Sequence, residues 1–363
     1  MFRKKKNQEL DLTQKEPCAG ERRKFLAGEA VFFSPKPMPA YHLKSEDTVP
    51  SSEILEVNDA YMDIGVRCQG KAFQVQFGLV SINAVSFVAL LILTHAGFFY
   101  GGPFLDAFLR AFNEIVFGIS IVYLLLAGIV WFVIIKTSFE YARQRPIRFH
   151  RQRREICYYP DGRTTPVIAP WEQIVSWVAL SRGTTGTNVM TTYTFGMAIP
   201  TPDGKDYWLL RQPVYSVGEA QRKWETMRSY MDEPQKNWPR SLPFIKEDRA
   251  MFDAERERIW AKFKKGPRKW LSFKFTDPAD SYFTLFCYYF YHILSCWKIP
   301  YLVSEWTDSL NKKPLPENIN EWSQPLPKNE WQQPSEALLT QRTAIKKHYE
   351  AGGNLTNFLQ TKH

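Results

Sequence analysis

Residues 77–100 read FGLVSINAVSFVALLILTHAGFFY, and residues 115–135 read IVFGISIVYLLLAGIVWFVII. The first run contains one basic residue, His95, and the second contains no ionisable residue except Tyr123. A helix needs about 20 apolar residues to cross the ~30 Å hydrocarbon core of a bilayer. We therefore predict a transmembrane helical hairpin over residues 77–136. The alternative is a pair of buried core helices in a soluble protein.

The connection between the two runs contains a turn and a charged helix face. Residues 101–103 are Gly-Gly-Pro, which ends the first helix and suits the first turn of the second. Asp106, Arg110 and Glu114 follow at four-residue spacing and share one face of a helix. Within the first span, Asn83 and His95 stand out, because a polar or ionisable side chain inside a membrane suggests a function.

Basic residues follow the second span and predict the orientation of the hairpin. They are Lys136, Arg143, Arg145, Arg148, Arg151, Arg153 and Arg154. By the positive-inside rule this flank is cytoplasmic, and two spans place the N-terminus on the same side. Each Arg near an anionic leaflet adds about 1 kcal/mol of attraction. We therefore expect the six arginines to form a membrane-surface patch.

Composition limits the kinds of partner and site. The chain has 363 residues and a formal net charge of +10, which in a membrane protein indicates topology and anionic lipid, not nucleic acid. Its five cysteines are scattered without a CxxC pair. This spacing argues against a zinc site and a disulfide framework, and suits a reducing compartment.

The remaining segments predict a membrane-anchored α+β protein. We expect a polar tail over residues 1–53, a juxtamembrane strand within 54–76, and an antiparallel β-rich domain over 146–233. The helical spacing of residues 217–231 places Ala220, Trp224, Met227 and Met231 on one face. Antiparallel strands closed by one helix predict a pleckstrin-homology-like domain, an architectural analogy that carries no function.

Two stretches of this chain predict contact surfaces. Residues 181–188, SRGTTGTN, lack the ending of a nucleotide-binding loop and predict a hairpin tip, with Thr184, Thr185 and Asn188 as partner contacts. In residues 240–303, lysine and arginine residues are interspersed with aromatic residues. There Lys264, Lys265, Lys269 and Trp270 predict a second membrane-surface group.

A third apolar run, residues 282–297, reads YFTLFCYYFYHILSCW. It is short for a span, and its aromatic residues favour the headgroup level. We interpret it as a buried or interfacial helix, with a third crossing as the alternative. Because a third crossing would move the C-terminus to the other side, the length of this helix decides the topology.

Residues 304–363 form a tail rich in proline and tryptophan. PLPENINEW at 314–322 is echoed by PLPKNEW at 325–331, and this proline spacing predicts an extended strap without regular helix. We expect Trp322 and Trp331 to insert into grooves of this protein or of a partner. A short helix over 335–350 ends at Gly352-Gly353.

No catalytic constellation is recognisable in the sequence. The chain lacks HExxH, GxSxG and dinucleotide-binding glycine patterns, so we predict a non-enzymatic protein without cofactor or metal.

The order of parts resembles a known family. A polar tail, a two-span hairpin and IRFHRQRREICYY at 147–159, followed by Trp171, are similar to uncharacterised bacterial inner-membrane proteins. Genes of that family often lie beside type VI secretion effector genes. The resemblance implies an immunity or accessory protein that captures a toxin at the inner membrane. The alternatives are a membrane scaffold or lipid or peptide sensor, and a membrane-acting toxin or enzyme; the oligomeric state stays open.

Overall fold

The computed structural model is of mixed α+β type and divides into two compact units. Unit 1 contains residues 1–66, 145–243 and 315–363, and unit 2 contains residues 67–144 and 244–314. The structure describes residues 12, 17–26, 28–41, 51–65, 70–99, 103–160, 165–184, 189–201, 206–266, 269–272, 277–310 and 315–358. The loop residues Thr185 and Asn188 lie outside this description.

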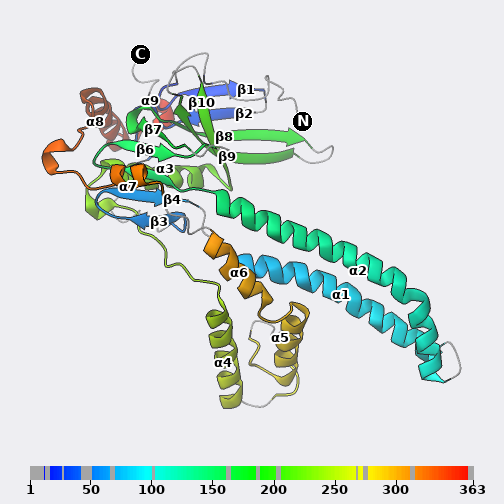
Figure 1. The fold of residues 1–363 in the computed structure, drawn as a ribbon. Helices are drawn as coiled ribbons and strands as arrows, with labels where there is room; N and C mark the ends of the chain where they lie inside the picture. Colours follow the sequence, from blue (N-terminus) through cyan, green and yellow to red (C-terminus); the bar gives the residue numbers. More distant parts are fainter. Residues whose placement is uncertain are drawn as a thin grey trace. The chain divides into compact units, whose positions relative to one another are not determined.

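The described residues of unit 1 form two antiparallel sheets of five strands (Figure 1). The first has the order β1-β2-β8-β9-β10, with strands Arg22–Phe25, Gly28–Phe32, Val175–Thr184, Val189–Pro200 and Tyr207–Val214. The second has the order β3-β4-β5-β6-β7, with strands Ile54–Val57, Tyr61–Ile64, Ile147–His150, Glu155–Tyr158 and Val167–Pro170.

Both N-terminal segments belong to these sheets. The prediction of a polar tail over residues 1–53 is wrong, because β1 and β2 extend the first sheet. Strand β2 pairs with β8, so that Ala30 lies opposite Ala179. The predicted strand within 54–76 is the hairpin β3–β4, whose second strand pairs with β5. Unit 1 is therefore assembled from three separate stretches of chain.

Helices complete the core of unit 1. They are α3 (Val217–Asp232), α7 (Glu317–Trp322), α8 (Glu336–Glu350) and α9 (Leu355–Phe358). Each of the two longer helices begins at a serine cap: Ser216 accepts a hydrogen bond from the Glu219 N–H, and Ser335 accepts one from the Leu338 N–H. The predicted apolar face of α3 is confirmed, because Ala220, Trp224, Met227 and Met231 are all buried.

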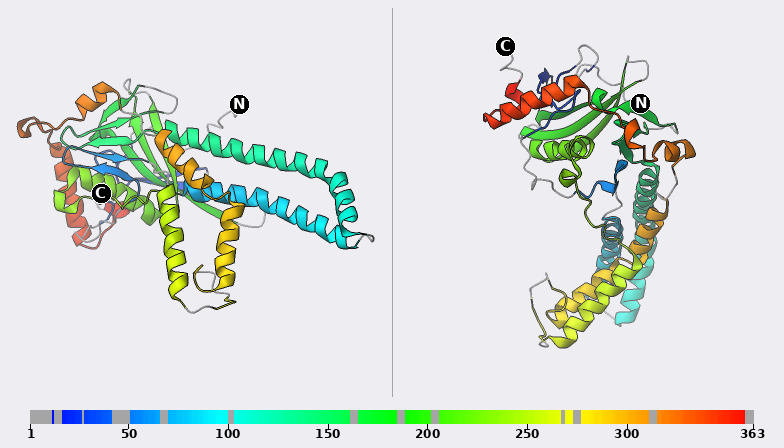
Figure 2. Two further views of the ribbon diagram at one scale, coloured as in Figure 1. Left: turned by 60° about the horizontal axis from the view of Figure 1, so that its bottom comes forward. Right: turned by 90° about the vertical axis from the view of Figure 1, so that its left-hand side faces the viewer.

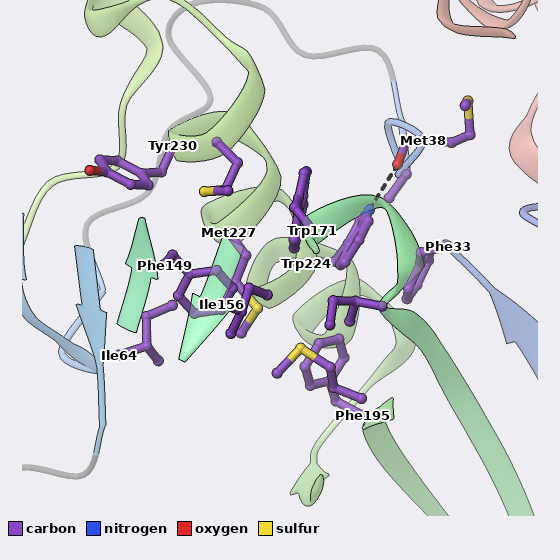
Figure 3. Packing of buried hydrophobic residues seen from close by; sticks show 14 of the residues in the cluster. Phe33, Met38, Ile64, Phe149, Ile156, Trp171, Phe195, Trp224, Met227 and Tyr230 are labelled. Atoms are coloured by element: carbon purple, nitrogen blue, oxygen red, sulfur yellow. Dashed lines mark hydrogen bonds between the residues drawn. The ribbon is translucent and has the colours of Figure 1, made fainter. Parts of the chain in front are cut away.

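The main core joins both sheets to α3, α8 and α9. Figure 3 shows Phe149 and Ile156 of the second sheet and Phe195 of the first in the same cluster as Trp224. The Trp224 indole stacks on Trp171 with ring centroids 5.3 Å apart, and its N–H donates to the Met38 carbonyl at 2.8 Å. Burial of such aromatic residues stabilises the unit through large apolar area.

Unit 2 contains two long helices, α1 (Lys71–Phe99) and α2 (Phe104–Arg143). They run as an antiparallel pair (Figures 1 and 2) and are long and apolar enough to span a membrane. In their most apolar stretches only 17% of the residues of α1 and 6% of those of α2 are buried. Core helices of a soluble protein bury this surface, so the exposure disfavours that alternative.

Three more helices of unit 2 follow in the later sequence: α4 (Arg249–Lys265), α5 (Tyr282–Leu294) and α6 (Ile299–Leu310). Helix α6 packs on the hairpin. Its buried Thr307 hydroxyl donates to Ser138 of α2 at 3.0 Å, and the Tyr301 hydroxyl accepts from Gln76 of α1 at 3.4 Å. The start of α1 is capped from a distance, because the Glu247 carboxylate accepts from the N–H groups of Gly70 and Ala72, each at 2.9 Å.

The sequence also predicts features of the C-terminal tail and of the connection between α1 and α2. The prediction of a tail without regular helix is wrong, because α7 forms between prolines: Pro316 occupies its N-cap position and Pro325 comes after its end. In the charged connection, Arg110 donates to the Asp106 carbonyl at 3.3 Å, and both side chains are exposed.

Candidate binding groove

A groove of about 760 Å³ opens in unit 1 beneath residues 323–335, which we call the strap. The strap connects α7 to α8. Its Asn329, Glu330, Trp331, Gln332 and Gln333 line one wall of the groove. The opposite wall comes from the second sheet and its adjoining turns, through Arg153, Glu155, Pro170 and Glu172.

Gln152 holds the strap against the sheet at two points. Its side-chain oxygen accepts from the Leu326 N–H at 2.6 Å, and its backbone carbonyl accepts from the Gln332 N–H at 2.9 Å. Within the strap, the Trp331 indole donates to the Leu326 carbonyl at 2.9 Å. These bonds fix the Trp331 ring in the wall of the groove.

A glutamate of unit 1 holds the chain at each end of the strap. Just before its start, Glu155 accepts from the indole of Trp322, the last residue of α7, at 2.8 Å. At the end, Glu172 accepts from the Ser335 N–H at 3.0 Å and from its hydroxyl at 2.6 Å. The strap therefore depends on two carboxylates that also line the groove.

Arg154 lies beneath the groove in a buried network. It pairs with Asp232 at 2.9 Å and with Glu172 at 3.3 Å. Burial alone would raise the pKa of Asp232, but Arg342, Arg154 and a hydrogen bond from the Trp171 indole outweigh it and hold that pKa below its usual value. Asp232 therefore stays ionised and joins α3, α8 and the sheet.

His150 of β5 contacts the end of α7 and the first residues of the strap. Its ring lies 5.0 Å from the Trp322 ring, and its Nε2 lies 3.4 Å from the Gln324 carbonyl. Burial lowers the pKa of His150 to about 4, with a further contribution from Arg153 and Arg148. The imidazole is therefore neutral near pH 7.

The predicted arginine patch is wrong for Arg148 and Arg154, because both are buried in ion pairs. Arg148 makes two bonds of 2.7 Å to Asp63, whereas Arg154 pairs as described above. Arg151 donates to the Tyr230 carbonyl and Arg153 donates to that of Trp322, so both are engaged inside unit 1. Buried guanidinium groups need carboxylate or carbonyl partners, and this fold supplies them.

The other predicted surface residues are more accessible. Arg143 is exposed at the end of α2, and Arg145 is half-buried with its guanidinium 6.0 Å from the Tyr159 ring. In unit 2, Lys264, Lys265, Lys269 and Trp270 are all exposed.

Of the predicted partner contacts within the described residues, only Trp331 is among the residues that line the groove. The Trp322 ring lies edge-on to the His150 ring instead. Thr184 ends β8, where it lies opposite Val189 in the β8–β9 pair. The sequence interpretation missed Gln152, Glu155 and Glu172. Their role in holding the strap is visible only from their long-range hydrogen bonds. The one signal in the sequence was the repeated PLP…NEW pattern, which marks the strap itself.

The accessible groups of the groove are amides, carboxylates, a guanidinium and an indole, whose chemistry is that of hydrogen bonds and ring stacking. The Ser335 hydroxyl is already engaged by Glu172 and by the cap of α8. Among the described residues, no group of three or more His, Cys, Asp or Glu side chains has the arrangement of a metal site.

Comparison with known proteins gives no match: no family model, no curated protein and no solved structure is similar to this chain. The functional argument therefore depends on the two units themselves.

Proposed function

We propose that this chain is a non-enzymatic binding protein, anchored in a membrane by α1 and α2, that captures a protein partner in the groove of unit 1. The observation that carries the proposal is the pre-ordered groove wall around Trp331. An aromatic ring held in place and surrounded by exposed amides is typical of a surface that binds a polypeptide.

The anchor is supported by the exposed apolar surfaces of both long helices. Six arginines between residues 143 and 154 support a cytoplasmic location for unit 1. The resemblance of residues 147–171 to bacterial inner-membrane proteins supports that membrane as the location. It also supports a toxin of a contact-dependent, type VI-like secretion system as the partner.

The proposal keeps a pleckstrin-homology-like architecture for unit 1 as an analogy. The two antiparallel sheets support it, as does helix α3, which follows β10 directly in the chain. The analogy adds no function, because the groove lies at the strap, an element outside that architecture.

A protection experiment tests the function. Bacterial cells would express the toxin encoded beside this gene, with or without the full-length chain. We expect the wild-type chain to restore growth. Glu330→Lys and Gln333→Ala, two changes of exposed strap residues, should weaken protection, whereas Leu339→Ala on the exposed face of α8 should not.

Two results would count against the proposal in different ways. Cells that grow equally with and without the wild-type chain would exclude the immunity role. Full protection by both strap variants would exclude the groove as the contact surface, since their exposed side chains contribute little to folding.

A further inference from the structure

Helices α4 and α5 form an antiparallel helical lobe in unit 2 (Figures 1 and 2). Its inner face is apolar: Ile259 and Phe263 of α4 pack with Leu285 of α5 and with Ala279. The Phe263 ring also meets the Tyr282 ring edge-on, with centroids 5.0 Å apart. The lobe is therefore a folded element with its own small core.

The outer surface of the lobe exposes large apolar side chains. Trp270 is 82% exposed, Phe286 62% and Ile293 64%. Leu271 and Trp260 are also exposed. Burying one such side chain contributes about 1.5–3 kcal/mol, so a cluster of them in water indicates a missing apolar neighbour.

The exposed face of α5 is continuous with the apolar surface of α1. The Phe290 ring of α5 meets the Phe87 ring of α1 edge-on, with centroids 5.2 Å apart, and Phe290 stacks on Phe286. Because Phe87 belongs to the span of α1, whatever solvates that span also reaches Phe286.

A polar contact fixes α5 at this place along the hairpin. The Asn83 amide of α1 donates to the Leu294 carbonyl at 2.7 Å, and its oxygen accepts from the Tyr123 hydroxyl of α2 at 3.1 Å. The only amide in the apolar run 77–100 therefore satisfies a carbonyl at the end of α5. Such a bond is expected where no water is present to replace it.

Helix α4 begins against α6. At its start, Arg249 pairs with Glu305 of α6 at 3.0 Å, and the Phe252 ring lies 5.1 Å from the Tyr301 ring. Helix α5 has 13 residues, about 20 Å, which is too short to cross a ~30 Å core. This length favours the prediction of a buried or interfacial helix over a third crossing.

Charge identifies the kind of surface that covers the lobe. Residues 258–282 contain seven Lys or Arg and two Asp. Lys264, Lys265 and Lys269 are exposed beside Trp260 and Trp270. Lysine with tryptophan is the combination found where a protein meets anionic headgroups.

We propose that the α4–α5 lobe is a second membrane-contact surface, which inserts Phe286 and Ile293 into the apolar layer of an anionic bilayer beside α1 and holds Trp270 near the headgroups. The lobe lies along the leaflet beside the hairpin and adds an interfacial attachment to the two spans. This inference rests on the proposed anchor, and it does not depend on the identity of the toxin partner.

Depth-dependent fluorescence quenching tests the lobe in the full-length chain. Its five native cysteines would be replaced by alanine, and single cysteines introduced for an environment-sensitive fluorophore. The reporters are Phe286→Cys and Ile293→Cys. Leu124→Cys on the exposed face of α2 reports on the anchor, and Leu339→Cys on α8 of unit 1 is the control outside the membrane. Nanodiscs would contain phosphatidylcholine with or without phosphatidylglycerol, together with lipids that carry the quencher either near the headgroup or in the acyl chain, and each reporter is scored by its stronger quenching.

We expect quenching at Phe286 and Ile293 to exceed that at Leu339 by about threefold or more in anionic discs. Replacing Lys264, Lys265 and Lys269 by glutamate should lower quenching at Phe286 in anionic discs and leave it unchanged in neutral ones.

Three outcomes would overturn the inference. Quenching at Phe286 and Ile293 no greater than at Leu339, with Leu124 quenched, would reject the lobe and keep the anchor. An unquenched Leu124 would reject the anchor itself, and with it the proposed function. If the fluorophores at positions 286 and 293 become less exposed to water as the protein concentration rises, with no effect of the quencher lipid, a second copy of the chain covers this surface.

Discussion

Arg148 illustrates how the fold changes the meaning of a charged residue. In the sequence it is one of six arginines that follow an apolar span. In the structure its guanidinium makes two bonds of 2.7 Å to Asp63 and a third of 2.7 Å to Ser323 at the start of the strap. It also lies 3.8 Å from the Tyr61 ring centroid. Arg148 therefore connects β4, β5 and the C-terminal segment.

Removing Arg148 should strongly destabilise unit 1. Arg148→Ala leaves the Asp63 carboxylate buried without its main partner, and breaking such a pair costs about 3–5 kcal/mol. Thermal unfolding of the full-length chain, followed by tryptophan fluorescence, measures the effect. The matched control is Arg182→Ala on β8, whose exposed side chain should change stability by less than about 0.5 kcal/mol. Equal unfolding midpoints for the two variants would show that the buried pair does not hold the unit.

His150 should make the strap sensitive to acid. Burial lowers its pKa from 6.5 to about 4, the Gln324 carbonyl opposes this shift, and Arg153 and Arg148 add to it. The unfolded chain binds a proton below pH ~6.5, whereas the folded chain does so only near pH 4, so stability falls between these values. The loss from this residue reaches up to about 3 kcal/mol and is absent above pH ~7.

Unfolding by denaturant at a series of pH values measures this loss. His150→Gln removes the titrating group, so its stability should decline less than that of the wild-type chain between pH 6.5 and 4. The same decline in both proteins would assign the acid sensitivity to other groups.

Helices whose signals lie in neighbouring residues could be predicted from the sequence. The helices α3 and α8 follow from helical spacing and from the capping residues Ser216 and Ser335. The hairpin follows from the length of its apolar runs. Each of these signals lies within about 20 neighbouring residues, where side-chain period and caps act directly.

Elements that depend on distant partners were not predictable in this way. Strand β1 reads RRKF and has no apolar alternation; it forms because β2 pairs with β8, about 150 residues later. The residues of the groove also depend on distant partners. The repeated PLP…NEW pattern predicts a contact role for Trp331. Nothing local in the sequence distinguishes Gln152 or Glu172 from other polar residues, because their hydrogen bonds go to the distant strap.

At the scale of the whole molecule, the last 49 residues complete unit 1. Helices α8 and α9 contribute Leu338, Ile345, Leu355 and Phe358 to the main core. Arg342 of α8 also pairs with the buried Asp232. A β-rich domain limited to residues 146–233 would lack these side chains, as well as β1 to β4.

Ending the chain after residue 314 should therefore unfold unit 1 and leave unit 2 helical. Four buried apolar side chains contribute about 1.5–3 kcal/mol each, which together match the whole stability of a typical domain. Unit 2 keeps all its residues, 67–144 and 244–314, so its helical circular dichroism and its membrane association should persist. Limited proteolysis should then cleave residues 145–243 and spare the hairpin.

Two neighbouring leucines of α8 test whether the truncated chain unfolds because core side chains are missing and not because the chain is shorter. Leu338 is fully buried and Leu339 is 48% exposed. Leu338→Ala should cost about 2–5 kcal/mol, and Leu339→Ala should cost little, by thermal unfolding of the full-length chain. If the two changes cost the same, or if the shortened chain resists proteolysis within residues 145–243, α8 does not belong to the core of unit 1. The strap would then lack the fixed end that Ser335 and Glu172 give it, and the groove beneath it would no longer be ordered before a partner binds.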